Sequence, residues 1–250
     1  TGETCTRCLI YVDGATGADS NTGRAWSEAL ATVTQGLIAA ELDGCEIWVA
    51  EGVYYPTEFP WLRDETFQLV PNVAIFGGFS GGEMLRDERD IVTHETILSG
   101  DLNRSGSLDI GNVFHVVTGA DDATIDGFTI TGGNASESDY LSLDAGGGGM
   151  LNDGVSPTIE NCTFLANSAN YYGGGLYNIN ASPNVSNCVF MENSSGYGGG
   201  MSNINSTPNI ANCEFLENSA FSGGGLYNED SSPVVSSCEF SGNDGSNGGG

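Results

Sequence analysis

Short alternating runs of hydrophobic and polar residues predict a chain built from very short β-strands. Thr158-Ile159-Glu160 alternates polar, apolar, polar, and Cys162-Thr163-Phe164 then alternates in the opposite phase. Such alternation is typical of half-buried strands, because successive side chains point to opposite faces. Asn161 separates the two runs and predicts a tight bend, since asparagine tolerates a left-handed backbone.

This pattern is an internal repeat. Triple glycines begin at Gly147, Gly173, Gly198, Gly223 and Gly248, in steps of 26, 25, 25 and 25. Four further columns keep the same register: Cys162, Cys188, Cys213 and Cys238; Phe164, Phe190, Phe215 and Phe240; Asn167, Asn193, Asn218 and Asn243; Pro157, Pro183, Pro208 and Pro233. A period of this length indicates a solenoid, a propeller or an array. Twenty-five residues are too few for a four-stranded propeller blade.

The repeat predicts an all-β fold, a right-handed parallel β-helix. Each unit offers three short strands, separated by one bend and two longer turns, and residues 165–172 form a polar connection. Coils stack at about 4.8 Å, so equivalent side chains form columns and the apolar columns fill the interior. The triple glycines supply unusual backbone conformations. A phosphate-binding role for them is disfavoured, because no helix and no lysine follow.

The repeat becomes irregular toward the N-terminus. Ile125–Ile130 aligns with Ile159–Phe164, and residues 134–146 form an inserted loop. Further strands are expected within residues 10–12, 46–50, 66–69, 73–76, 96–98 and 113–117. We therefore expect one domain over residues 1–250. It comprises an N-terminal strand and capping helix (1–45), irregular coils with the insertion (46–146) and regular repeats (147–250) that continue beyond this segment.

One segment predicts a helix. Trp26, Leu30, Val33 and Leu37 lie at positions i, i+4, i+7 and i+11, which makes one apolar stripe on a helix of residues 26–40. The end of a solenoid exposes apolar core and unpaired strand edges. We expect this amphipathic helix to cap the N-terminal end. The alternative is that it lies against the side of the solenoid.

The seven cysteines divide into two groups. Four occupy one inward column and are expected to be buried free thiols. A parallel stack keeps their Cβ atoms farther apart than a disulfide prefers, and a linear column does not converge on a metal. Cys5 and Cys8 form a lone CxxC, and one of them is expected to pair with Cys45. Such a bond suits an oxidising, extracytoplasmic setting.

Two motifs now carry a family resemblance. The repeats contain FxxN and a glycine tetrad similar to GGA(I/L/V), with glycine in place of alanine at the third position. The FxxN copies are Phe164-Leu-Ala-Asn167, Phe190-Met-Glu-Asn193, Phe215-Leu-Glu-Asn218 and Phe240-Ser-Gly-Asn243. This pairing resembles the repeats of the polymorphic outer membrane proteins, a bacterial surface β-helix family that includes adhesins. Residues 10–13, 25–26, 46–54, 97–102 and 115–117 also resemble the opening of secreted bacterial β-helix proteins.

The strongly negative net charge limits the classes of partner that this chain can bind. Thirty-three acidic residues face six arginines and no lysine, which gives a net charge of −27. No lysine or arginine follows Arg104, so nucleic acid is excluded as a partner and anionic membrane surfaces are disfavoured. No apolar run reaches 18 residues, so no membrane span is expected in this segment. The chain begins at Thr1 without a visible signal peptide.

No cofactor is firmly predicted, and calcium is the one candidate. Asp101 with Asn103, and Asp121 with Asp122, offer the oxygen ligands that calcium prefers. Neither pair has a recognised calcium-loop spacing. A solvated turn is the simpler explanation for each.

Three function classes remain open. The leading one is a non-catalytic module on the bacterial cell surface or outside the cell, which acts as a stalk or adhesin toward a surface protein or glycan. The second is a structural fibre, in which copies stack end to end. The third is a glycan hydrolase, which needs two suitably spaced carboxylates. The sequence offers Glu160, Glu192, Glu214, Glu217 and Glu239, but exposed acids are expected on any solvated face, so no catalytic residue is assigned.

Overall fold

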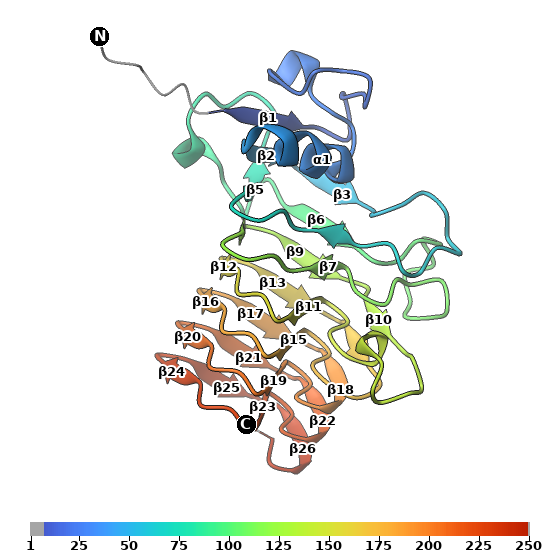
Figure 1. Ribbon diagram of the computed structural model, residues 1–250, viewed down its shortest axis with the longest axis vertical. Coiled ribbons are helices and arrows are strands. Elements are labelled where there is room, and N and C mark those ends of the chain that lie inside the picture. The colour runs from blue at the N-terminus through green and yellow to red at the C-terminus, as the bar shows by residue number, and fades with distance from the viewer. Residues whose placement is uncertain (1–7, 250) are drawn as a thin grey trace.

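The computed structural model describes residues 8–249, apart from the side chains of Leu42 and Asp43. Its strands wind into a right-handed parallel β-helix, capped at the N-terminal end by a helix (Figure 1). Every pairing between its named strands is parallel and joins one coil to the next, which confirms the predicted fold. No helix among the described residues is long and apolar enough to cross a membrane.

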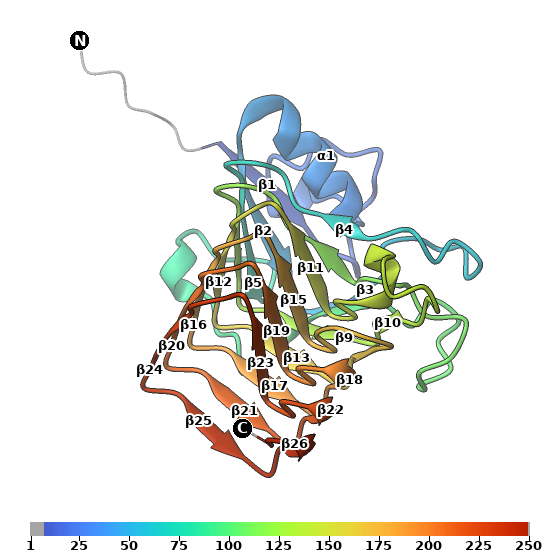
Figure 2. The ribbon, with the colours of Figure 1, turned by 60° about the horizontal axis from the view of Figure 1, so that its bottom comes forward.

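Four sheets form the walls of the solenoid, and the tilted view in Figure 2 shows their strands stacked coil upon coil. Sheet A contains β1 (Leu9–Val12), β2 (Glu46–Ala50), β5 (Ala74–Phe79), β8 (Thr124–Asp126), β12 (Thr158–Glu160), β16 (Asn184–Ser186), β20 (Asn209–Ala211) and β24 (Val234–Ser236). Sheet B contains β3 (Gly52–Tyr54), β6 (Thr96–Ser99), β9 (Thr129–Thr131), β13 (Thr163–Leu165), β17 (Val189–Met191), β21 (Glu214–Leu216) and β25 (Glu239–Ser241).

The other two sheets complete each coil. Sheet C contains β4 (Phe67–Gln68), β7 (Val117–Thr118), β11 (Met150–Asp153), β15 (Leu176–Ile179), β19 (Met201–Ile204) and β23 (Leu226–Glu229). Sheet D contains β10 (Asn134–Ala135), β14 (Ser168–Ala169), β18 (Ser194–Tyr197), β22 (Ser219–Ser222) and β26 (Asp244–Asn247). A regular coil therefore has four strands, and the prediction of three was wrong. Residues 165–172 are not merely a polar connection, because their backbone pairs through β14 with the coils on either side.

The predicted columns are in register. Ile159 pairs with Ile125 and Val185, and Phe164 pairs with Ile130 and Phe190, so the alignment of the irregular coil with the repeats was correct. The phenylalanine rings stack along the interior, 4.7–4.8 Å apart from centroid to centroid and within 6° of parallel. These columns join the cysteines and sheet C's apolar residues in one continuous core.

The bends explain the conserved register of the polar residues. Asn161, Asn187, Asn212 and Ser237 all have a left-handed backbone, with φ between 51° and 54°. That confirms the predicted bend between sheets A and B. A second left-handed corner follows sheet B at Ala166, Glu192 and Glu217, with φ of 50–55°. The sequence did not reveal this corner, because neither alanine nor glutamate favours that conformation.

The N-terminal cap forms, but its helix starts later than predicted. Helix α1 (Val33–Asp43) buries Val33, Leu37 and Ala40 against the core. Thr32 accepts a hydrogen bond from the Gln35 N–H, and this N-cap fixes where the helix begins. Gly36 allows close contact, because a Cβ there would lie 2.7 Å from a methyl of Val12.

The predicted helix of residues 26–40 was wrong over its first part. Trp26 lies in the short 3₁₀ helix η1 (Trp26–Glu28), and Leu30 forms a parallel bridge with Val12. The apolar stripe is divided because Leu30 packs in the core whereas Trp26 packs in a separate cluster with Trp48 and Phe79. The other short helices are η2 (Arg86–Glu88) and η3 (Leu143–Ala145). The strands expected at residues 66–69 and 113–117 are shorter than predicted.

Candidate functional site

A row of aromatic side chains runs along the outside of the solenoid where sheets C and D meet. Tyr172 and Tyr197 each stand directly before a triple glycine, and their backbones pair across one coil step. The ring of Tyr172 stacks on that of Tyr197 at 5.5 Å, and Tyr197 lies 5.1 Å from Tyr227. Phe221 packs edge-on against Tyr197 and is 59% exposed. We call these residues, with Tyr177, the aromatic ridge.

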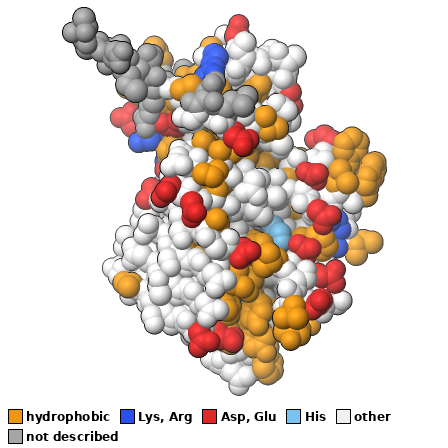
Figure 3. Space-filling model, in the orientation of Figure 1, with side chains coloured by type: hydrophobic (Ala, Val, Ile, Leu, Met, Phe, Trp, Pro, Cys, Tyr) orange, Lys and Arg blue, Asp and Glu red, His pale blue; other side chains and the backbone are white. Residues whose placement is uncertain are grey.

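The ridge is a coherent surface feature. Figure 3 shows hydrophobic side chains gathered in a strip that runs along the coils between sheets C and D. Tyr177 stacks on Tyr172 at 5.3 Å and is largely buried, so it supports the outer rings. Stacked phenol rings present apolar edges together with hydroxyl groups, a combination that suits binding surfaces.

Two ridge hydroxyls, those of Tyr172 and Tyr227, stay protonated near neutral pH because their pKa values are raised. Burial raises the pKa of Tyr172, and burial together with a hydrogen bond to Glu229 raises the pKa of Tyr227 to about 12. The Tyr227 hydroxyl donates to Glu229 Oε2 at 3.1 Å. The Tyr172 hydroxyl can therefore donate and accept hydrogen bonds toward a ligand, whereas that of Tyr227, whose proton is directed at Glu229, can accept them.

The inserted loop adjoins the ridge. The predicted insertion began two residues too early, because Asn134 and Ala135 form β10 and pair with β14. Residues 136–146 leave the solenoid after β10 and return through η3. Tyr140, 58% exposed, packs against Tyr171 at 6.1 Å, and the Tyr171 hydroxyl donates to the Ser138 carbonyl. Arg63 donates to the Asn134 carbonyl and to the Ser136 hydroxyl, each at 2.9 Å. The insertion is thus fixed on both sides and extends the aromatic surface.

A histidine anchors the base of the insertion. His115 is buried, and its Nδ1 donates to the Gly147 carbonyl at 2.9 Å. Its Nε2 lies 3.4 Å from Asp144 Oδ1. The interaction with His115 lowers the pKa of Asp144. This is a structural arrangement, since His115 faces the protein rather than the surface.

The cysteines are arranged as predicted. Cys8 and Cys45 form a disulfide, which confirms that one of the two CxxC cysteines pairs with Cys45 and identifies it as Cys8; Cys5 lies outside the described residues. Cys162, Cys188, Cys213 and Cys238 are free, and the first three are buried. Their thiols donate to backbone carbonyls, as in the pair Cys188 and Ser186 at 3.3 Å. Within residues 8–249, no group of three or more histidine, cysteine or acidic side chains is placed to hold a metal.

The calcium candidates stabilise turns. Asp101 accepts hydrogen bonds from the Ser105 and Gly106 N–H groups, and Asn103 donates to Asp109. Asp121 accepts from the Ser156 N–H at 2.9 Å. Asp122 adopts a left-handed backbone in the same turn as Asp121. The structure thus brings Asp101 and Asn103 together with Asp109, while Asp121 and Asp122 lie in another turn. Calcium binding at either place stays a prediction.

The carboxylates considered for hydrolysis lie on separate surfaces. Glu160 is on sheet A, whereas Glu214 and Glu239 are direct register partners on the outer face of sheet B. Glu192 and Glu217 occupy equivalent corners of successive coils. All but Glu160 are exposed, and no hydrogen bond links any two of them among the described contacts. Catalysis at these residues was not assigned from the sequence, and the geometry adds no reason to assign it.

Sequence reasoning missed the aromatic ridge. Its signal was present, because Tyr172 and Tyr197 keep the 25-residue register directly before the glycines. A column of outward positions is harder to recognise than an inward one, because outward side chains vary between coils. The column that contains Tyr172 and Tyr197 continues with Gly146 on one side and Ser222 on the other.

Comparison with known proteins places the chain in a family. No curated protein and no solved structure matches it. One family model, described as a protein of unknown function (DUF1565), matches residues 15–221. This range runs from the N-terminal cap through the sixth strand of sheet B and so includes the insertion and most of the ridge. The chain belongs to the DUF1565 family.

Proposed function

We propose that this chain is a non-catalytic β-helix module, located on the bacterial cell surface or outside the cell, that serves as a stalk or adhesin and binds a neutral glycan along the aromatic ridge. The observation that carries the proposal is the row of tyrosines along the solenoid, with exposed Phe221 packed against Tyr197 and exposed Tyr140 on the neighbouring insertion. The resemblance of the FxxN and glycine motifs to the polymorphic outer membrane proteins points to the same role.

The chemistry of the ridge favours a sugar. Pyranose rings have C–H faces that pack against aromatic rings, and their hydroxyls bond to phenol groups, so amphipathic aromatic side chains suit them. Phe221 and Tyr140 are more than half exposed, which leaves ring surface for such contacts. Residues 105–250 contain no lysine or arginine, so an acidic glycan would meet repulsion without a compensating ion pair from this part of the chain.

The rigid solenoid and the disulfide fit this role. Successive coils hold the rings at fixed spacing, so little conformational entropy is lost when an extended chain binds along them. The bond between Cys8 and Cys45 is typical of proteins in oxidising compartments. Sixteen acidic residues beyond Arg104 keep the exposed surface soluble.

A sedimentation assay tests the proposal. The purified chain would be incubated with insoluble cellulose, chitin, curdlan and mannan, and the bound fraction measured. We expect binding to at least one of these neutral polysaccharides, with a clear loss in Phe221→Ala and Tyr140→Ala. Val92→Ala is the matched control, because Val92 is 87% exposed and lies away from the ridge.

Two results would contradict the proposal. Absence of binding to all four polysaccharides, or equal binding by the ridge variants and the control, would remove the ridge as a glycan site. Release of reducing sugars in the same incubations would indicate a hydrolase instead. Filaments of the purified chain in electron micrographs would favour the fibre role.

A further inference from the structure

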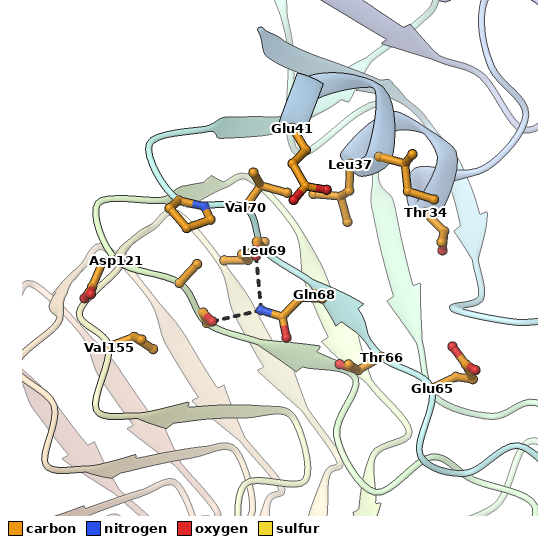
Figure 4. A pocket seen from close by; sticks show the side chains of 14 residues that line it. Thr34, Leu37, Glu41, Glu65, Thr66, Gln68, Leu69, Val70, Asp121 and Val155 are labelled. Carbon is orange, nitrogen blue, oxygen red and sulfur yellow. Dashed lines mark hydrogen bonds between the residues drawn. The ribbon is translucent and has the colours of Figure 1, made fainter. Parts of the chain in front are cut away.

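A groove separates the capping helix from the first strand of sheet C. Helix α1 contributes Leu37 and Ile38 to one wall, and Leu69 and Val70, which follow β4, form the other (Figure 4). The groove has a volume of about 640 Å³. That volume lies within the range of small-molecule sites, roughly 300–1,000 Å³.

The fold creates this groove. Strand β4 is the edge of sheet C, and α1 lies beside it where a further strand would continue the sheet. A helix is about 10 Å across, whereas neighbouring strands lie about 4.8 Å apart. Because α1 is wider than a strand, it cannot pack against the edge of β4 as closely as another strand would. A groove therefore remains between α1 and the chain at β4.

The inner surface of the groove is apolar and well ordered by hydrogen bonds. Leu37, Leu69 and Ala120 are each at most 5% exposed and form its base. The Gln68 side chain is held in the wall, because its Nε2 donates to the Gly119 carbonyl at 3.0 Å and its Oε1 accepts from the Thr118 hydroxyl at 2.7 Å. Ile38 is 48% exposed and offers apolar surface at the rim.

Three carboxylates surround this apolar base. Glu41 comes from α1, Glu65 precedes β4, and Asp121 lies in the turn after β7. Figure 4 shows Glu41 reaching from the helix toward Val70, with Glu65 and Asp121 toward opposite ends of the groove. None of the residues that line the groove is basic. A ligand here therefore meets negative charge at several points and hydrocarbon between them.

We propose that this groove binds a linear aliphatic polyamine. Ammonium groups separated by methylene segments complement carboxylates that are separated by apolar side chains. An anionic amphiphile such as a fatty acid would be repelled by the same carboxylates. A compact multivalent cation would gain the electrostatic attraction but not the contacts with Leu37, Leu69 and Ile38. The proposal is independent of glycan binding at the ridge.

Titration calorimetry of the whole chain tests this, with spermidine as the probe and hexaamminecobalt(III) as a compact ion of equal charge. At an ionic strength of about 0.15 M, long-range attraction to the acidic surface is largely screened. We expect spermidine to bind about tenfold more tightly than the cobalt complex. Glu41→Gln and Asp121→Asn should each weaken spermidine binding about tenfold. Ile38→Ser should weaken spermidine binding but leave that of the cobalt complex unchanged.

Glu217→Gln is the matched control. It removes one negative charge at an exposed corner on a distant coil, and we expect it to leave spermidine binding unchanged. All four substitutions are at exposed positions, and circular dichroism would verify that the fold is retained. The proposal is overturned if spermidine does not bind, if both cations bind equally well, or if Glu217→Gln weakens binding as much as Glu41→Gln does.

Discussion

The side-chain amide of Asn193 donates a hydrogen bond to the side-chain carbonyl of Asn218, one coil further along, at 3.0 Å. The same Nδ2 donates to the Phe164 carbonyl at 2.9 Å, and the Asn193 backbone N–H also donates to Asn218. Asn193 is fully buried. The asparagine of FxxN therefore bonds both along the column and across the corner that follows sheet B.

Removing one amide from this column should destabilise the solenoid. Asn193→Ala leaves the buried Asn167 N–H without its acceptor and removes the side-chain donor to the Phe164 carbonyl, and an unsatisfied buried group costs about 1–3 kcal/mol. We expect the free energy of unfolding in urea to fall by about 3 kcal/mol. Asn184→Ala, at an exposed strand position of the same coil, should change it by less than about 0.5 kcal/mol. Equal effects of the two variants would contradict the role of the amide column.

The left-handed bends predict a position-specific response to valine. Asn187 has a φ of 53°, a conformation that costs a β-branched residue about 1–2 kcal/mol or more. Asn187→Val should lower the free energy of unfolding by at least that amount, whereas Asn187→Gly should be nearly neutral. The same substitution at Asn184, which lies in a strand, should be neutral or slightly stabilising. Similar losses at both positions would show that the bend geometry is not responsible.

The interior thiols should be unreactive in the folded protein. Burial raises the pKa of Cys188 well above its usual value, whereas the hydrogen bond with Cys188 lowers the pKa of Cys213 to about 7. The common protection of the interior thiols is therefore their burial, which keeps the reagent out. We expect iodoacetamide to leave Cys162, Cys188 and Cys213 unmodified in the folded protein. After denaturation all three should react, and no reductant should be required. Peptide mapping by mass spectrometry distinguishes them from Cys8 and Cys45, which should react only after reduction. A disulfide between two interior cysteines would contradict the free-thiol column.

One turn beside the cap should be sensitive to acid. Partial burial alone would raise the pKa of Glu83, but hydrogen bonds from Ser80 and the Gly82 N–H outweigh it and lower the pKa to about 2. A lowered carboxyl pKa stabilises the fold above the unfolded pKa of about 4.3, and this contribution is lost as the pH falls toward 2. Because Glu83 is mostly solvated, the effect at neutral pH is about 1 kcal/mol or less.

The measurement is thermal unfolding of the wild type and Glu83→Gln at pH 7 and pH 3. The variant should melt at a lower temperature at pH 7, and the difference should shrink at pH 3. Glu217→Gln removes the same charge from an exposed corner and should show no such pH-dependent difference. A gap that widens in acid would reverse the predicted sign.

The fold was predictable because the repeat places each residue type in a column. Phe164 and Asn167 recur in step with the glycines, and only stacked coils require such a register. The corner at Glu192 was not predictable, since its left-handed backbone is imposed by the stacked amides rather than by the residue's own preference. The fourth strand was missed because its two-residue core, Ser168–Ala169, has no apolar alternation of its own.

The surfaces were less predictable than the core. The start of α1 depends on Thr32 as an N-cap and on the pairing of Leu30 with Val12, neither of which a 3.6-residue periodicity contains. The helix begins at Val33 rather than at residue 26, and this later start determines which of its side chains face β4. The groove could therefore not be predicted from the sequence. The disulfide to Cys45 was predictable in part. The four cysteines of the repeats belong to the interior column, which leaves Cys5 and Cys8 as the remaining partners for Cys45.

The most direct test of the account is the contact between the phenylalanine rings of successive coils. The Phe190 ring lies 4.7 Å from Phe164 and 4.8 Å from Phe215, so selectively ring-labelled protein should give nuclear Overhauser effects from Phe190 to both rings. Effects from Phe164 directly to Phe215, two coils apart, should be absent. Contacts of Phe190 with neither ring, or only with residues of its own coil, would contradict the stacked parallel β-helix and every surface derived from it.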